Sequence, residues 1–231
     1  MSTSTAAQIG CPACGESFQT DRAVSVDAAR NPESRAAILD KTFQVAACPH
    51  CHRRARLPPG FTYIDLAAGQ WIAAHPFDDR GAWSSFEESA HLAWDEAMGP
   101  GTPAEASGLA AKISPRIVFG WPALREKLLC VELGVRDDAL EVLKLWLLRQ
   151  LAYDDRAAGV ELRLSGGDAE RLDFSWVDGS TEEVVLQAGI LRNAYEALLS
   201  DPEIWTGSAV PFAGQLFVDS ERLLAAPADV E

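Results

Sequence analysis

Four cysteines in two matched pairs are the residues of this chain whose types and spacing point most directly to chemistry. Cys11 and Cys14 form one Cys-Pro-x-Cys motif, and Cys48 and Cys51 form a second. Two cysteines three residues apart can turn both sulfurs toward one ion, and four thiolates match the tetrahedral preference of Zn²⁺. The sequence therefore predicts one zinc ion bound by these four residues. Because four sulfurs leave no position open for water, the site is expected to be structural rather than catalytic.

Cysteine pairs of this spacing also occur in redox-active sites, so a redox alternative stays open. Gly15 follows the first pair and suits the positive φ that such a turn needs. A single Cys-Pro-x-Cys motif also resembles a glutaredoxin-type active site, which requires a helix N-terminus in a βαβ setting. Two motifs are present here, and the residues after both of them favour strands or turns. Zinc is the preferred interpretation, and a zinc-thiolate redox switch is kept as an alternative.

Neighbouring residues suggest further ligands but have simpler explanations. His50 lies between the two cysteines of the second pair and His52 follows them, yet four sulfurs already fill a tetrahedral shell. Cys130 lies in an apolar helical run and is expected to be a small core residue rather than a fifth ligand. Arg53, Arg54 and Arg56 form the one basic cluster, which raises the alternative of a nucleic-acid-binding zinc ribbon.

Charge distribution argues against that alternative for most of the surface. The chain has 231 residues and a net charge of −14, and residues 78–231 hold 13 Lys and Arg against 28 Asp and Glu. Nucleic-acid affinity begins with neutralisation of phosphates, so an acidic surface repels nucleic acid. No run of 18 apolar residues and no secretory signal is found, so a cytoplasmic protein with reduced thiols is expected.

Pattern analysis predicts a small β-rich unit over residues 1–77. Strands are expected at 16–26, 42–47, 61–66 and 70–74, with one helix at 31–40. In the acidic remainder, 78–231, helices are expected at 84–98, 122–133, 139–153 and 182–200. A short strand and a turn are expected over 113–121, and strands at 160–164, 172–176 and 210–218. Residues 99–103 are expected to be a linker and 219–231 a frayed tail.

Several residues of the acidic region have a predicted environment. Trp146 and Trp176 are expected in the core. Glu87, His91 and Asp95 share one helix face, which is expected to be solvated. No phosphate-binding glycine loop, nucleophile elbow or zinc-protease motif occurs. An enzyme of unfamiliar type would need a pocket between the ribbon and the helical region, for which His91, Glu126 and Asp137 are the candidate residues.

These motifs together resemble a known family. The two Cys-Pro-x-Cys pairs, the segment NPESRAAILDKTFQVAACPHC and the adjoining LPPGFTYIDLAAGQWIAAHP are similar to the CpXC family of bacterial proteins. The run RIVFGWPALREKLLCVELGVRDDALEVLKL at 116–145 resembles the region C-terminal to these motifs in longer members. The resemblance implies a zinc site at Cys11, Cys14, Cys48 and Cys51 and a bacterial cytosol, and it supplies no reaction and no substrate.

The sequence thus predicts an α+β fold with two domains. Residues 1–77 form a zinc ribbon-like β unit, and residues 78–231 form an acidic region with an αα-hairpin and a β-hairpin. The predicted function is a non-enzymatic protein-interaction module stabilised by one structural Zn²⁺. Its partner is expected to be another protein, with nucleic acid and membrane disfavoured and the oligomeric state open.

Overall fold

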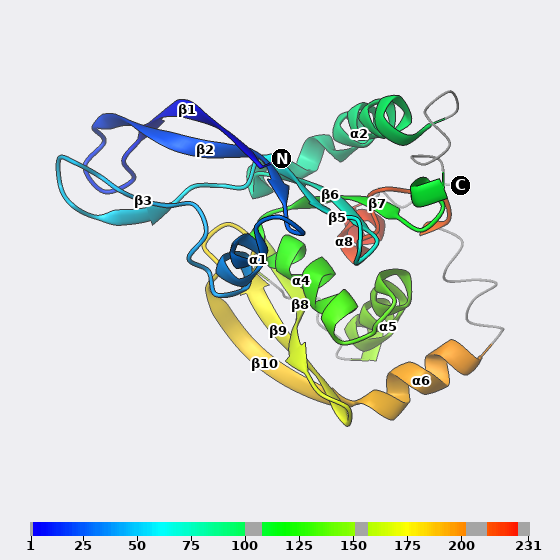
Figure 1. Ribbon diagram of the computed structural model, residues 1–231. Coiled ribbons are helices and arrows are strands. Elements are labelled where there is room, and N and C mark those ends of the chain that lie inside the picture. Colours follow the sequence, from blue (N-terminus) through cyan, green and yellow to red (C-terminus); the bar gives the residue numbers. More distant parts are fainter. Residues whose placement is uncertain (1, 100–107, 151–156, 202–211, 226–231) are drawn as a thin grey trace, which may run out of the picture. The chain divides into compact units, whose positions relative to one another are not determined.

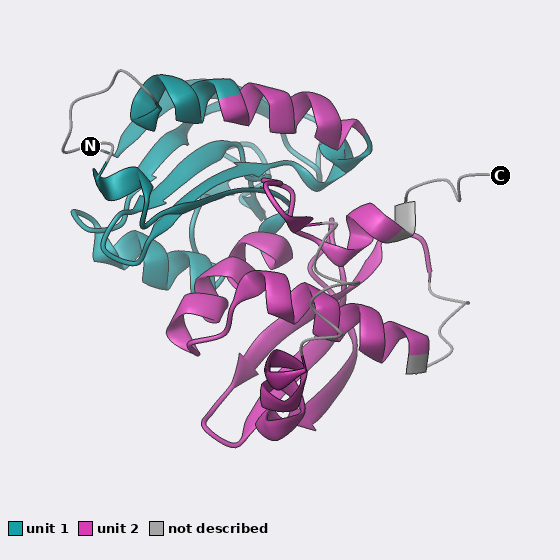
Figure 2. Ribbon diagram, turned by 90° about the vertical axis from the view of Figure 1, so that its right-hand side faces the viewer, with its two compact units in different colours: residues 1–81, 92–121 teal, residues 82–91, 122–231 magenta. Residues whose placement is uncertain are grey.

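The computed structural model describes residues 2–99, 108–150, 157–201 and 212–225 (Figure 1). Helices and strands are mixed along the chain, which confirms the predicted α+β class. The chain divides into two compact units, residues 1–81 with 92–121 and residues 82–91 with 122–231 (Figure 2). The domain boundary at residue 77 stays a prediction. No helix of the described residues is long and apolar enough to cross a membrane.

A five-stranded mixed sheet forms the first unit. Its strands, in spatial order, are β1 (Thr3–Gly10), β2 (Ser17–Asp27), β5 (Phe61–Asp65), β6 (Gln70–His75) and β7 (Ser114–Phe119). Five of the six residues of β6 are buried, as expected for a strand covered on both faces. Helix α1 (Pro32–Leu39) begins with a proline at its first turn and buries Ile38 completely.

A separate two-stranded hairpin belongs to the same unit. Strand β3 (Val45–Ala47) pairs antiparallel with β4 (Arg54–Arg56). Strands β1 and β2 form another antiparallel hairpin of the unit, in which Gly10 pairs with Ser17. The loops that close these two hairpins are residues 11–16 and 48–53, which contain the two cysteine pairs.

Helices and a three-stranded antiparallel sheet form the second unit. The sheet has the order β10-β9-β8, from β8 (Val160–Gly167), β9 (Arg171–Asp178) and β10 (Val184–Leu191). The helices are α4 (Trp121–Glu132), α5 (Asp137–Gln150), α6 (Arg192–Ser200) and α8 (Ser220–Ala225). Alternate residues of β9, Leu172, Phe174 and Trp176, are buried in one core with Leu140 and Leu143 of α5.

Helix α2 (Trp83–Met98) follows a short 3₁₀ helix, η1 (Phe77–Ala82), and its residues are divided between the two units. Glu87 lies in the part assigned to the second unit. Its carboxylate is buried and accepts hydrogen bonds from the backbone N–H groups of Leu216 and Phe217, both at 2.8 Å. Arg222 donates to the same carboxylate. The prediction of a solvated face is therefore wrong at Glu87.

The prediction of one helix over 182–200 is wrong in its first half. Residues 184–191 form strand β10, and helix α6 begins only at Arg192. Ser180 and Glu183 have the spacing of a helix N-terminal capping box, but they lie in the connection between β9 and β10, where the Asp178 carboxylate accepts hydrogen bonds from the backbone N–H groups of Ser180 and Thr181. Val184, Val185 and Ile190 are β-branched, and pairing with β9 outweighs the weak helical pattern.

Two C-terminal predictions also fail in the described residues. Residues 212–218 form no strand, and the rest of the predicted strand lies outside the described residues. Residues 219–225 are not a frayed tail, because Asp219, Ser220 and Glu221 are buried and α8 begins at Ser220.

Trp176 is buried as expected, but Trp146 is 49% exposed, contrary to the prediction. The predicted linker at 99–103 lies almost wholly outside the described residues.

Candidate metal centre

The two cysteine loops share one backbone geometry. In the first loop, the Gly15 N–H donates to the carbonyl of Cys11 and the Cys11 N–H donates to the carbonyl of Glu16, both at 2.9 Å. In the second loop, the His52 N–H donates to the carbonyl of Cys48 and the Cys48 N–H donates to the carbonyl of Arg53, again both at 2.9 Å. Each loop thus turns its two cysteines in the same way, at the end of a β-hairpin.

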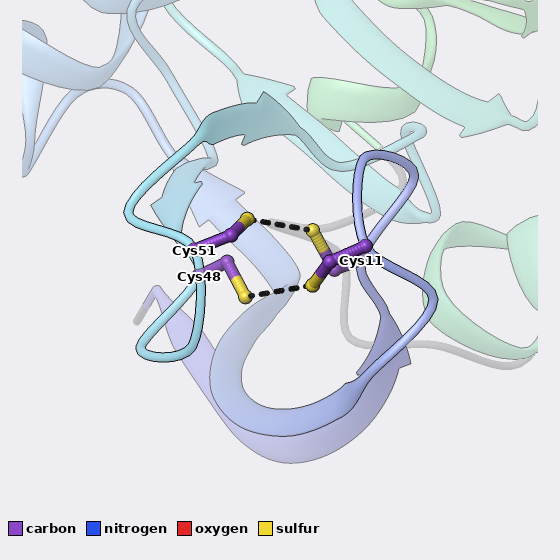
Figure 3. A group of neighbouring side chains, drawn as sticks. Cys11, Cys48 and Cys51 are labelled. Carbon is purple, nitrogen blue, oxygen red and sulfur yellow. Dashed lines mark hydrogen bonds between the residues drawn. The ribbon is translucent and has the colours of Figure 1, made fainter.

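All four sulfurs converge. The Sγ atoms of Cys11, Cys14, Cys48 and Cys51 lie within 4.8 Å of one another. Cys11 and Cys51 are 3.6 Å apart and Cys14 and Cys48 are 3.8 Å apart, so each close contact joins one loop to the other. Figure 3 shows Cys48 and Cys51 facing Cys11 across the gap between the loops. All four are free cysteines, since these separations far exceed the roughly 2.05 Å of a disulfide bond.

This arrangement fits a tetrahedral metal ion. A metal–sulfur distance of about 2.3 Å in a tetrahedron requires sulfur–sulfur distances of about 3.8 Å. The two close sulfur pairs already have that spacing, so a metal needs little rearrangement of the loops. The four-cysteine cluster is therefore compatible with metal binding, as the sequence predicted for the same residues.

Burial is uneven across the cluster. Cys11 and Cys48 are buried against Phe18, with Ile9 and Ala46 packed beside them. Cys14 is exposed and Cys51 is half-buried. One side of the cluster is therefore held in an apolar environment, and the other side faces solvent.

The two thiols of the first loop have pKa values shifted in opposite directions. The backbone N–H groups of Cys14 and Ala13 lower the pKa of Cys11 to about 6. At Cys14 the N–H of Glu16 also lowers the pKa, but partial desolvation of the sulfur and the hydrogen bonds with the neighbouring thiols outweigh this and raise the pKa to about 12. A divalent ion in the middle of the cluster favours the thiolate form of every ligand, so binding would release protons.

The other residues considered from the sequence lie outside the cluster. His50 and His52 are exposed, and the four sulfurs converge without them. Cys130 is buried in the core of the second unit, where burial raises its pKa well above the usual range. Arg56 stacks on the Trp121 ring at 3.8 Å and donates to the carbonyl of Phe43, whereas Arg53 and Arg54 are exposed.

A buried network of charges in the second unit was not predicted from the sequence. Lys144 Nζ lies 2.9 Å from Glu126 and 2.8 Å from Glu141, and Arg163 lies 3.0 Å from Glu126 and 2.7 Å from Asp219. All of these residues are buried. Burial opposes ionisation of Asp219, but the charges of Arg163, Lys144 and Lys127 outweigh it and lower its pKa.

Two residues considered for an enzymatic cleft belong to this network. Glu126 is fully buried within it, and Asp137 pairs with Lys127, which donates to the carbonyl of Val218. These contacts are made from α4, α5, β8 and the segment before α8, elements distant in sequence. No local pattern predicts such partners, because charged residues are usually exposed. The two carboxylates therefore hold Lys127 and Arg163, and these two cations reach the C-terminal segment at Val218 and Asp219.

The fold and the cysteine cluster define a mixed α+β protein with a metal-compatible four-sulfur centre at the ends of two hairpins. The family model described as CpXC protein matches residues 9–144, more than half of the chain. The chain belongs to the CpXC family, and the matched segment contains all four clustered cysteines. Searches of curated proteins and of solved structures returned no match.

Proposed function

We propose that the protein is a zinc-stabilised, non-enzymatic protein-interaction module. The observation that carries the proposal is the convergence of Cys11, Cys14, Cys48 and Cys51 from two loops with the same hydrogen bonding. Borderline-soft Zn²⁺ suits four thiolates, and a closed four-sulfur shell has no vacant position for a substrate. Zinc would then act as a cross-link between the β1–β2 and β3–β4 hairpins, in the manner of a zinc ribbon.

Metal replaces a hydrophobic core at this end of the first unit. Among the residues that the structure describes, the apolar cluster around the site contains Phe18 and the two buried cysteines, with Ile9, Ala46 and Cys51 packed on it. So small a cluster contributes little burial energy to hold the two hairpins together. Zinc binding would supply that energy, as it does in small metal-dependent domains.

An exposed aromatic side chain supports the interaction part of the proposal. Trp146 on α5 is 49% exposed, and large aromatic residues are the usual anchors of protein interfaces. In the same unit Val131 on α4 is 45% exposed. The expected partner is another protein in a cytoplasmic setting, and the strongly acidic chain disfavours nucleic acid.

Partner capture with matched cysteine variants tests the proposal. The tagged full chain, Cys51→Ser and Cys130→Ala are each purified from the organism that produces them, and bound proteins are identified and quantified. The proposal predicts one stoichiometric partner for the wild type and for Cys130→Ala, and loss of that partner with Cys51→Ser. Capture of no stoichiometric partner by the wild type contradicts the interaction role, and equal capture by all three contradicts its dependence on the metal.

The two alternatives make different predictions. A nucleic-acid-binding ribbon would have to rely on Arg53 and Arg54, because Arg56 stacks on the Trp121 ring and donates a hydrogen bond to the Phe43 carbonyl. It predicts a gel shift that weakens steeply with salt, whereas our proposal predicts none. A redox switch predicts metal release and disulfide formation in mild peroxide. The structural role predicts that the metal is retained under those conditions.

A further inference from the structure

Strand β10 is an unusual edge strand. It lies at one end of the sheet order β10-β9-β8, and in the described part of the chain it pairs with β9 alone (Figure 1). Seven of its eight residues are exposed. Four are large and apolar, namely Val184, Val185, Leu186 and Leu191. An apolar edge strand without charge or proline is a template for pairing with another strand.

The outer edge of β10 presents a defined set of backbone groups. The Arg192 N–H donates to the carbonyl of Glu170 at 2.8 Å, which fixes the phase of the ladder with β9. Because hydrogen-bonded pairs alternate along an antiparallel ladder, the N–H and C=O groups of Gln187, Gly189 and Leu191 point away from β9. Three successive outward-facing residues can support a further antiparallel strand.

We propose that β10 pairs with β10 of a second copy of this chain, joining the two sheets into one of six strands. A two-fold axis requires the same patch on both copies to be self-complementary. Pairing centred on Ala188 places Gln187 of each copy opposite Gly189 of the other, so the outward-facing groups of both strands meet. It also sets Leu186 opposite Ile190. The small side chain of Ala188 stands at the axis, where a non-hydrogen-bonded pair brings its Cα atoms closest.

The distribution of charge makes this edge a more favourable place for a second copy than the rest of the acidic surface. The chain carries a net charge of −14, so two copies repel each other over most of their acidic surface. Residues 184–191 carry no charge. Glu182 and Glu183 precede the strand and Arg192 follows it, so an antiparallel arrangement brings the acidic start of each strand beside the basic end of the other. This inference does not rest on the metal or on the proposed function.

Sedimentation velocity of the metal-replete full chain over a range of concentrations tests the proposal. We expect a species of twice the 24.9 kDa chain mass. Leu186→Lys places a charge in the paired face, and Gln187→Pro removes an outward-facing N–H without breaking the ladder with β9. Both should raise the dimer Kd more than tenfold. Leu92→Lys, which alters another exposed leucine on α2, should leave it unchanged.

Hydrogen exchange of the wild type keeps the test decisive if a variant fails to fold. The amides of Gln187, Gly189 and Leu191 should become protected as the concentration rises. A wild type that stays monomeric, or a dimer that survives both β10 variants in folded form, overturns the proposal. Protection of these amides only after another protein's extended segment is added overturns it as well.

Discussion

Gly15 and His52 occupy the same position in the two cysteine loops, four residues after Cys11 and Cys48. Both have a positive φ, 78° at Gly15 and 59° at His52, and both donate their N–H to the carbonyl of the first cysteine of their loop. Only glycine adopts this conformation without steric cost. The second loop therefore carries a strain that the first avoids.

A matched pair of substitutions should reveal that strain. His52→Gly is expected to raise the free energy of unfolding by up to about 1 kcal/mol, because the left-handed cost disappears. Gly15→Ala should lower it by about 1 kcal/mol. A Cβ at Gly15 meets no atom within 4 Å, so this loss is conformational. Chemical unfolding of the metal-bound proteins checks both. Destabilisation by His52→Gly equal to that of Gly15→Ala would contradict the equivalence of the two positions.

The buried network predicts a large loss of stability when one charge is removed. Lys144→Met leaves Glu126 and Glu141 with less compensation in a buried site, and should cost about 3–5 kcal/mol. Arg136→Met serves as a control, because the Arg136 side chain is 61% exposed and pairs with Asp138 at the surface. The control should cost about 1 kcal/mol or less. Similar losses for both variants would show that the buried ion pairs contribute no more to stability than the exposed pair.

Acid should unfold the second unit through the same network. Folding lowers the pKa of Asp219 and of Glu126, in each case because neighbouring cations outweigh burial. Their contribution to stability is therefore present above the unfolded carboxyl pKa of about 4 and is lost as pH falls below it. Glu141 acts in the opposite sense, since burial raises its pKa.

Asp219→Asn isolates this effect. The variant should be less stable at neutral pH, and its stability should fall less than that of the wild type as pH decreases from about 5 to 2. Unfolding by denaturant at a series of pH values measures both curves, with Asp173→Asn as an exposed control. Parallel curves for wild type and Asp219→Asn would refute a stabilising role for the Asp219 carboxylate.

The part of the fold that could be predicted from sequence is the part fixed by local signals. The cysteine loops were predictable because each uses six neighbouring residues, and Gly15 marked the positive φ. The hairpin of β8 and β9 was predictable from alternating apolar residues around a glycine-containing turn. In both cases, the residues that form the contact are close in sequence.

The misses depend on contacts between distant residues. Residues 184–191 form a strand because they pair with β9, although Ser180 and Glu183 nearby have the spacing of a helix N-terminal cap. The carboxylate of Glu87 is buried because it receives N–H groups about 130 residues away. Arg163 likewise pairs with Asp219, 56 residues further along the chain. Single-sequence patterns hold no information on such partners.

The most direct test of the metal centre is the metal content of freshly purified protein, combined with the absorption spectrum after Co²⁺ replacement. One zinc per chain is predicted for the wild type and for Cys130→Ala, with much less for Cys51→Ser. Co²⁺ should give the intense thiolate charge-transfer and d–d bands of a tetrahedral four-sulfur site. Chelation should lower the melting temperature of the first unit. Protein that is metal-free as purified and folded identically with and without zinc would contradict the account.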